Sequence, residues 1–109
     1  MSFAGAAELL QAAVFNRLGE DAQWEGVDGA VRVRRREYDE ESRFSEGGSE
    51  ILTVRYIRVR RSEVTQPSGG QEIQILNDAG APIEGALYRV NGEPELDRKG
   101  VWRCPVELV

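Results

Sequence analysis

The side chains of this chain that could do chemistry are arginines and carboxylates, and they form three blocks between residues 30 and 61. The two outer blocks are basic, with Arg32, Arg34, Arg35 and Arg36 in the first and Arg55, Arg58, Arg60 and Arg61 in the second. The middle block is acidic, with Glu37, Asp39, Glu40, Glu41, Glu46 and Glu50 against Arg43. Separate positive and negative surfaces on one small domain favour a head-to-tail contact, in which the basic arm of one copy meets the acidic block of the next.

Catalytic chemistry finds little support. The chain has no histidine, which excludes a Ser/His or Cys/His nucleophile pair and any His-containing metal site. It has neither a phosphate-binding Gly-x-x-x-x-Gly-Lys loop nor a Gly-x-Gly-x-x-Gly turn. The carboxylates cluster in polar segments, where water solvates them, and the acidic run lacks the ligand spacing of a calcium loop. We therefore expect a protein that is not an enzyme and that needs no metal or cofactor.

Size and composition predict a single domain over 1–109. The net charge of −5 disfavours non-specific binding of nucleic acid by the surface as a whole. Cys104 is the only cysteine, so no intrachain disulfide can form, and its β-type surroundings predict a small buried side chain. No apolar run approaches about 18 residues, so we expect neither a membrane span nor a signal peptide.

Residues 2–18 are predicted to form a helix. Phe3, Leu10 and Val14 belong to a set of apolar side chains that recur at spacings of three and four. Gly19 is a natural residue to follow the helix end. We expect the apolar face of this helix to pack on the core, with an intersubunit contact as the alternative.

Residues 27–109 are predicted to form the β part of the fold. Val31 and Val33 alternate with arginines, and the apolar phase slips between Tyr56 and Ile57, which predicts a bulge or a strong twist there. Segment 20–29 reads as a polar connector whose Trp24 caps the edge of the core, and 81–85 as irregular. Further strands are expected at 72–76, 86–91 and 101–109, with turns at 62–71 and 77–80. The expected fold is mainly β: a small antiparallel barrel or sandwich with an N-terminal helix and a long hairpin loop.

The acidic block predicts a mobile loop over 39–50. It is about a dozen residues long, whereas hairpin loops usually need about two to five. A solvated, tolerated insertion is the plain interpretation. The functional interpretation is a loop that reaches something outside its own domain.

The order of elements over 27–109 resembles lambda-type phage head–tail joining proteins of the virion neck. The segments that carry the resemblance are 51–56, the turn through Gly69 and Gly70, 72–75, 88–94 and 97–102 with the terminal strand that follows. The resemblance implies a structural virion protein that assembles as a ring of about six copies. The ring would lie between the portal or adaptor of the DNA-filled head and the tail, after assembly in the host cytoplasm.

In some proteins of this kind a hairpin loop plugs the channel until the genome is released. The resemblance thus implies that the acidic loop faces channel DNA, with Asp39, Glu40, Glu41, Arg43, Phe44 and Glu46 as the channel-loop residues. The assembly contact is expected at the arginines of the two arms, namely Arg32, Arg34, Arg36, Arg58 and Arg60.

Two alternatives stay open at this stage. One is a tail-terminator or tail-completion protein of the same apparatus. The other is a small nucleic-acid-binding β-barrel, for which arginines on adjacent strands would supply a basic stripe. Against the second, Lys99 is the only lysine, and Tyr56 is the only aromatic residue interleaved with the arginines, so a base-stacking platform is missing.

Overall fold

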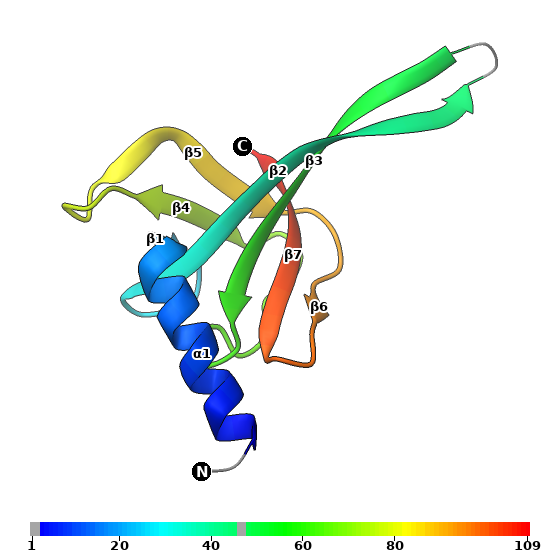
Figure 1. Cartoon of the computed structure of the whole chain (residues 1–109). Coiled ribbons are helices and arrows are strands. Elements are labelled where there is room, and N and C mark those ends of the chain that lie inside the picture. Colours follow the sequence, from blue (N-terminus) through cyan, green and yellow to red (C-terminus); the bar gives the residue numbers. More distant parts are fainter. Residues whose placement is uncertain (1–2, 46–47) are drawn as a thin grey trace.

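The computed structural model describes residues 3–45 and 48–109. The helix α1 comes first, and seven strands follow it (Figure 1). Their bounds are α1 Phe3–Leu18, β1 Glu20–Trp24, β2 Ala30–Ser45, β3 Gly48–Arg60, β4 Glu72–Leu76, β5 Pro82–Val90, β6 Glu95–Leu96 and β7 Val101–Leu108. The predicted mainly β fold with an N-terminal helix is confirmed.

Six of the described strands close into an antiparallel barrel in the order β3-β2-β1-β4-β5-β7, with β7 pairing back onto β3. The two-residue strand β6 pairs with β7 at Trp102 and Arg103. Closure removes the unpaired edges that an open sheet of this size would present to solvent. The expected choice between barrel and sandwich is thereby decided in favour of the barrel.

The barrel core is apolar, and its largest fully buried side chains come from every barrel strand. They are Trp24, Val33, Ile57, Val59, Ile73, Ile75, Val90 and Cys104. Val33 and Val59 are register partners across β2 and β3, so the alternation seen in the first basic arm does place its valines inside. The predicted burial of Cys104 is confirmed.

The barrel begins at Glu20 and not at residue 27, because segment 20–24 forms strand β1. Trp24 does not cap the edge of the core: it is completely buried, and its indole Nε1 donates a hydrogen bond to Gln71 Oε1 at 3.0 Å. Few apolar residues occur here, so no local pattern indicates a strand. The strand exists because β2 and β4 pair with it on either side.

The described residues of 39–50 form strands and not the loop that was expected there. Strand β2 continues to Ser45 and β3 begins at Gly48, and the described parts of the segment are paired in a ladder that includes Asp39 with Thr53 and Ser42 with Glu50. The hydrogen bonds of a β-ladder join backbone N–H and C=O groups, so an acidic side-chain composition does not prevent the ladder from forming. Glu46 lies outside the described residues, and the mobility of the segment stays a prediction.

The β2–β3 ladder has no bulge between Tyr56 and Ile57, and the strong twist that was the alternative there stays a prediction. The β2–β3 register runs without a break from Val33–Val59 to Ser42–Glu50, and the irregularity lies between Ser42 and Ser45. The apolar phase changes there for another reason. The β3–β7 pairing ends at Tyr56, so beyond that point the ribbon has left the barrel and no face of it has to be inside.

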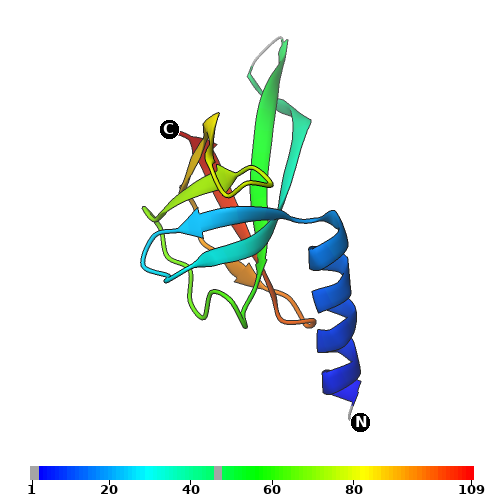
Figure 2. The same ribbon diagram turned by 90° about the vertical axis from the view of Figure 1, so that its left-hand side faces the viewer.

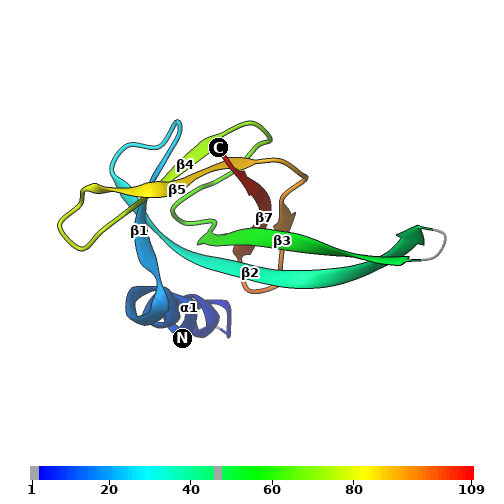
Figure 3. The same ribbon diagram turned by 90° about the horizontal axis from the view of Figure 1, so that it is seen from above.

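Helix α1 does not cover the core. The C-terminal end of α1 adjoins the barrel, and the N-terminal end of the helix extends away from the barrel (Figure 2). Phe15 is buried, whereas Leu9 and Leu10 are 59% and 62% exposed, so the expectation of core packing holds only for the last turns. Seen from above, α1 and the β2–β3 ribbon project from different sides of the barrel (Figure 3). In the segment 81–85, β5 begins at Pro82, where an irregular stretch was expected.

Candidate partner-binding surface

The most prominent charged feature of the described chain is a row of three arginines on adjacent strands. Arg34 on β2 is the register partner of Arg58 on β3, and Arg58 is the register partner of Arg103 on β7. The three side chains are at least partly exposed. None of them forms an ion pair with any described residue. We call this set the arginine row.

An aromatic pair lies next to the arginine row. The Arg103 guanidinium carbon lies 4.0 Å from the centre of the Tyr56 ring, and the Tyr56 ring stacks on Tyr38 with 5.9 Å between centroids. The interaction with the Tyr56 hydroxyl raises the pKa of Arg103. The guanidinium is therefore held charged and in a defined place against an aromatic face.

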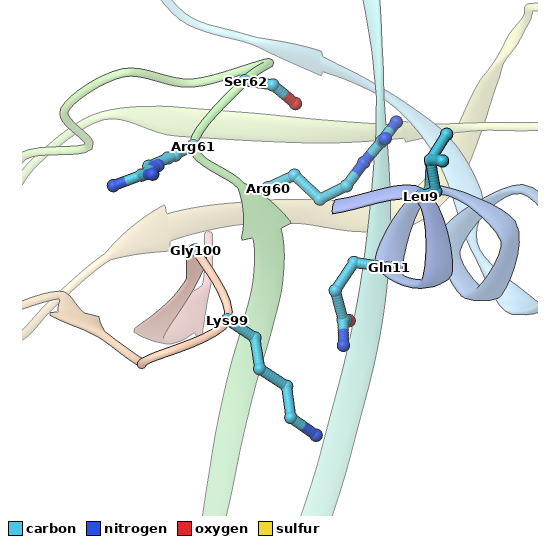
Figure 4. Close-up of a pocket in the computed structure, with 8 residues that line it drawn as sticks. Leu9, Gln11, Arg60, Arg61, Ser62, Lys99 and Gly100 are labelled. Carbon is cyan, nitrogen blue, oxygen red and sulfur yellow. The ribbon is translucent and has the colours of Figure 1, made fainter. Parts of the chain in front are cut away.

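A groove lies between α1, from Leu9 to Phe15, and the barrel. One part, of about 250 Å³, lies between Leu9 and Gln11 of the helix and the basic end of β3 (Figure 4). A second part, of about 320 Å³, reaches the arginine row, because Arg34 and Arg58 line it. Lys99 lines both parts. The helix side of the groove is thus largely apolar, and the barrel side carries Arg34, Arg58 and Lys99 together with Asp97.

Acidic groups near this groove are already engaged within the chain. The Asp97 carboxylate accepts hydrogen bonds from the backbone N–H groups of Lys99 and Val101, at 2.8 and 3.0 Å. Glu95 is the register partner of Arg103 on β6, where its charge helps to raise the pKa of Arg103 without forming an ion pair. The Arg34 and Arg58 end stays positively charged.

Two of the five predicted assembly arginines serve the fold of their own chain. Arg32 forms an ion pair with Asp21 at 3.0 Å and donates hydrogen bonds to the backbone oxygens of Phe15 and Asn16, which ties α1 to the barrel. Arg60 lies 3.6 Å from the Glu63 carboxylate and 5.8 Å from the Phe15 ring centre. The arrangement of these two side chains explains how the helix end is anchored.

The other three predicted assembly arginines lie along the paired strands β2 and β3. Arg34 and Arg58 belong to the arginine row, and Arg36 is the register partner of Tyr56 one step further along the ribbon. The predicted channel-loop residues Asp39, Glu40, Glu41, Arg43 and Phe44 lie on strand β2, distal to the barrel, while Glu46 is outside the described residues. The structure thus places the acidic block beyond the arginine row on the same pair of strands.

Sequence reasoning missed Arg103 and Lys99 as members of this surface. Both residues are distant in sequence from the two basic arms, so no local pattern connects them with these arms. Only the pairing of β7 with β3 brings Arg103 beside Arg58. The signal that could have found Arg103 is the alternation within 101–108, which separates it from the buried Cys104.

A family comparison decides what kind of protein carries this surface. Residues 2–106 match the model of the phage head-tail attachment protein family. The chain belongs to that family. A head-tail attachment protein is a structural, non-enzymatic component of the head–tail junction of the phage virion, and it binds head and tail proteins there. No curated protein matches the chain.

For a head-tail attachment protein the relevant chemistry is binding. Within the described part of the chain, no group of three or more Cys, Asp and Glu residues is placed to hold a metal ion. No helix of that part has the length and apolar character needed to span a membrane. The arginine row and the groove beside it are the surface best suited to hold a charged partner.

Proposed function

We propose that this head-tail attachment protein assembles as a ring of about six copies at the virion neck, between the portal or adaptor of the filled head and the tail. In that ring the β2–β3 ribbon would extend toward the channel axis and narrow or close the channel.

The observation that carries the proposal is the free-standing ribbon. Since β3 leaves β7 at Tyr56, the distal part of the β2–β3 ladder has no further described strand beside it. The radius of gyration is 15.5 Å, whereas a compact domain of this length has about 13 Å. An isolated two-stranded ribbon is only marginally stable in water, so contacts with other molecules are the natural support for it.

The composition of the ribbon supports a position near channel DNA. The acidic residues between Glu37 and Glu50 would repel DNA phosphates, so the ribbon would not adhere to the genome as it passes. Arg34, Arg36 and Arg58 are the predicted assembly arginines left for contacts between copies, because Arg32 and Arg60 hold their own chain together.

Electron microscopy of particles made without this protein tests the joining role. We expect DNA-filled heads and separate tails of normal length, since a joining protein acts after both parts are complete. Tails of irregular length would assign the chain to tail termination. Image averaging of complete necks gives the number of copies directly, and a single copy per neck would overturn the ring.

Neutralising the ribbon tests channel closure. In particles that carry Glu40→Gln, Glu41→Gln and Glu46→Gln, we expect altered retention of DNA in filled heads, with an unchanged melting temperature of the isolated protein. The matched control neutralises three exposed acids outside the ribbon, with Asp78→Asn, Glu84→Gln and Glu93→Gln. Equal retention in wild type, variant and control would reject a closing role.

A further inference from the structure

The arginine row is electrostatically unfavourable in the isolated chain. Neighbouring strands lie about 4.8 Å apart, and like charges directly opposite one another on adjacent strands destabilise a sheet. Arg34, Arg58 and Arg103 occupy one such line, and none has an ion-pair partner among the described residues. An anionic partner laid across the row would relieve this repulsion.

The site is prepared for such a partner at one end. The Tyr56 ring lies 4.0 Å from the Arg103 guanidinium, so that side chain has less freedom to lose when it binds a carboxylate. A guanidinium also offers two parallel donors, which match the two oxygens of a carboxylate.

The groove beside the row selects the kind of partner. Leu10 and Val14 of α1 face the same cavity as Arg34 and Arg58. An occupant that fills it must bring apolar side chains together with carboxylates. A DNA backbone brings charge without apolar side chains, so a peptide segment fits this surface better than a nucleic acid does.

The chain itself contains a segment of that composition. The distal ribbon combines the acidic block with Tyr38, Phe44, Ile51, Leu52 and Val54. It cannot bind the arginine row of its own copy, because both lie on the same paired strands. Seven residues separate Arg34 from Glu41 along β2, which corresponds to about 23 Å at about 3.3 Å per residue. Binding must therefore take place between copies.

We infer that the acidic distal part of the β2–β3 ribbon of one copy binds across the arginine row of a second copy, at the edge of the groove beside α1. This inference rests on the proposed ring, and it names the contact that would build it. The two surfaces differ, so the contact is head-to-tail, and repetition of it generates a closed ring if the rotation between copies allows closure.

Charge exchange between the two surfaces tests the inference. The row variant carries Arg34→Glu and Arg58→Glu, and the ribbon variant carries Glu40→Arg and Glu41→Arg. The matched control, Arg17→Glu with Arg98→Glu, makes the same change in net charge as the row variant at exposed sites outside the row and the groove. Sedimentation velocity measures self-association, and amide chemical shifts of the labelled protein, followed up to about 1 mM, locate it.

We expect wild type and control to associate with concentration, with shifts at the arginine row and the distal ribbon together. Each charge variant alone should associate at least about ten-fold more weakly, and an equimolar mixture of the two should regain most of the loss. Undiminished association of the row variant, no gain on mixing, or no association of wild type at about 1 mM would overturn the inference.

Two further readouts keep this contact distinct from the ring. If copies form a ring in averaged necks of row-variant particles, the proposed function stands and the contact lies elsewhere. If a random-sequence DNA duplex shifts the row residues in wild type but not in the row variant, while the protein alone shows no association, the row is a phosphate site and the inference fails.

Discussion

The Arg35 guanidinium donates two hydrogen bonds to the carboxylate of Glu20, from Nε at 2.6 Å and from Nη2 at 2.5 Å. Its Nη1 also donates to the Tyr88 hydroxyl at 3.2 Å. One side chain of β2 thus joins β1 beside it and β5 across the barrel. Arg35 follows Val31 and Val33 in the alternation that places side chains on the inner face of β2. Its ion pair with Glu20 therefore lies where the inward-facing valines of this strand end.

Replacement of Arg35 tests this closing role. We expect Arg35→Met to lower the free energy of unfolding by about 1 kcal/mol, a modest value because the Arg35 and Glu20 side chains are each 34% exposed and water screens them. Chemical denaturation of Arg35→Met, Glu20→Gln and the double variant measures the coupling. Strictly additive effects would show that the two groups do not stabilise one another.

Gly19 allows the end of α1 to approach β2. A Cβ atom at this position would lie 2.9 Å from the Val33 backbone oxygen and closer still to that of Phe15. We expect Gly19→Ala to cost more than about 2 kcal/mol, measured by thermal unfolding, because backbone must move to accept the methyl group. Gly69→Ala is the control: its Cβ would meet nothing within 4 Å, and a change above about 0.5 kcal/mol there would undermine the steric explanation.

Truncation of two apolar residues of α1 should change the stability by very different amounts. Phe15→Ala should cost about 2–4 kcal/mol, because Phe15 is buried at the junction with the barrel. Leu10→Ala should change the free energy of unfolding by less than about 0.5 kcal/mol, because Leu10 is exposed. A large loss for Leu10→Ala in urea denaturation would mean that α1 packs against the barrel along its whole length.

Burial raises the pKa of the Cys104 thiol to about 12. The unfolded chain releases this proton near its ordinary value of about 9, so the stabilising contribution is complete below that pH and is lost as the pH rises from about 9 toward 12. We expect wild type to lose more stability than Cys104→Val between pH 8 and 10.5, in urea titrations at each pH. Parallel losses would contradict burial of the thiol, as would fast reaction of native protein with a thiol reagent at pH 8.

The local pattern of the sequence was sufficient for the helix up to Leu18 and for the strand character of both basic arms. These features depend on neighbours within a few residues, where periodicity and composition are decisive. The resemblance in the order of elements also led to the family that the comparison shows.

The tertiary structure decided which charges meet. Strand β1 exists because two other strands pair with it, and the acidic block is a ladder because pairing depends on backbone groups that no side-chain pattern reveals. Register across the closed barrel places Arg103 beside Arg58 and directs Arg35 to Tyr88. Barrel closure joins residues that are distant in the chain, and the physical reason is that their alignment is fixed by all the ladders together and by no single segment.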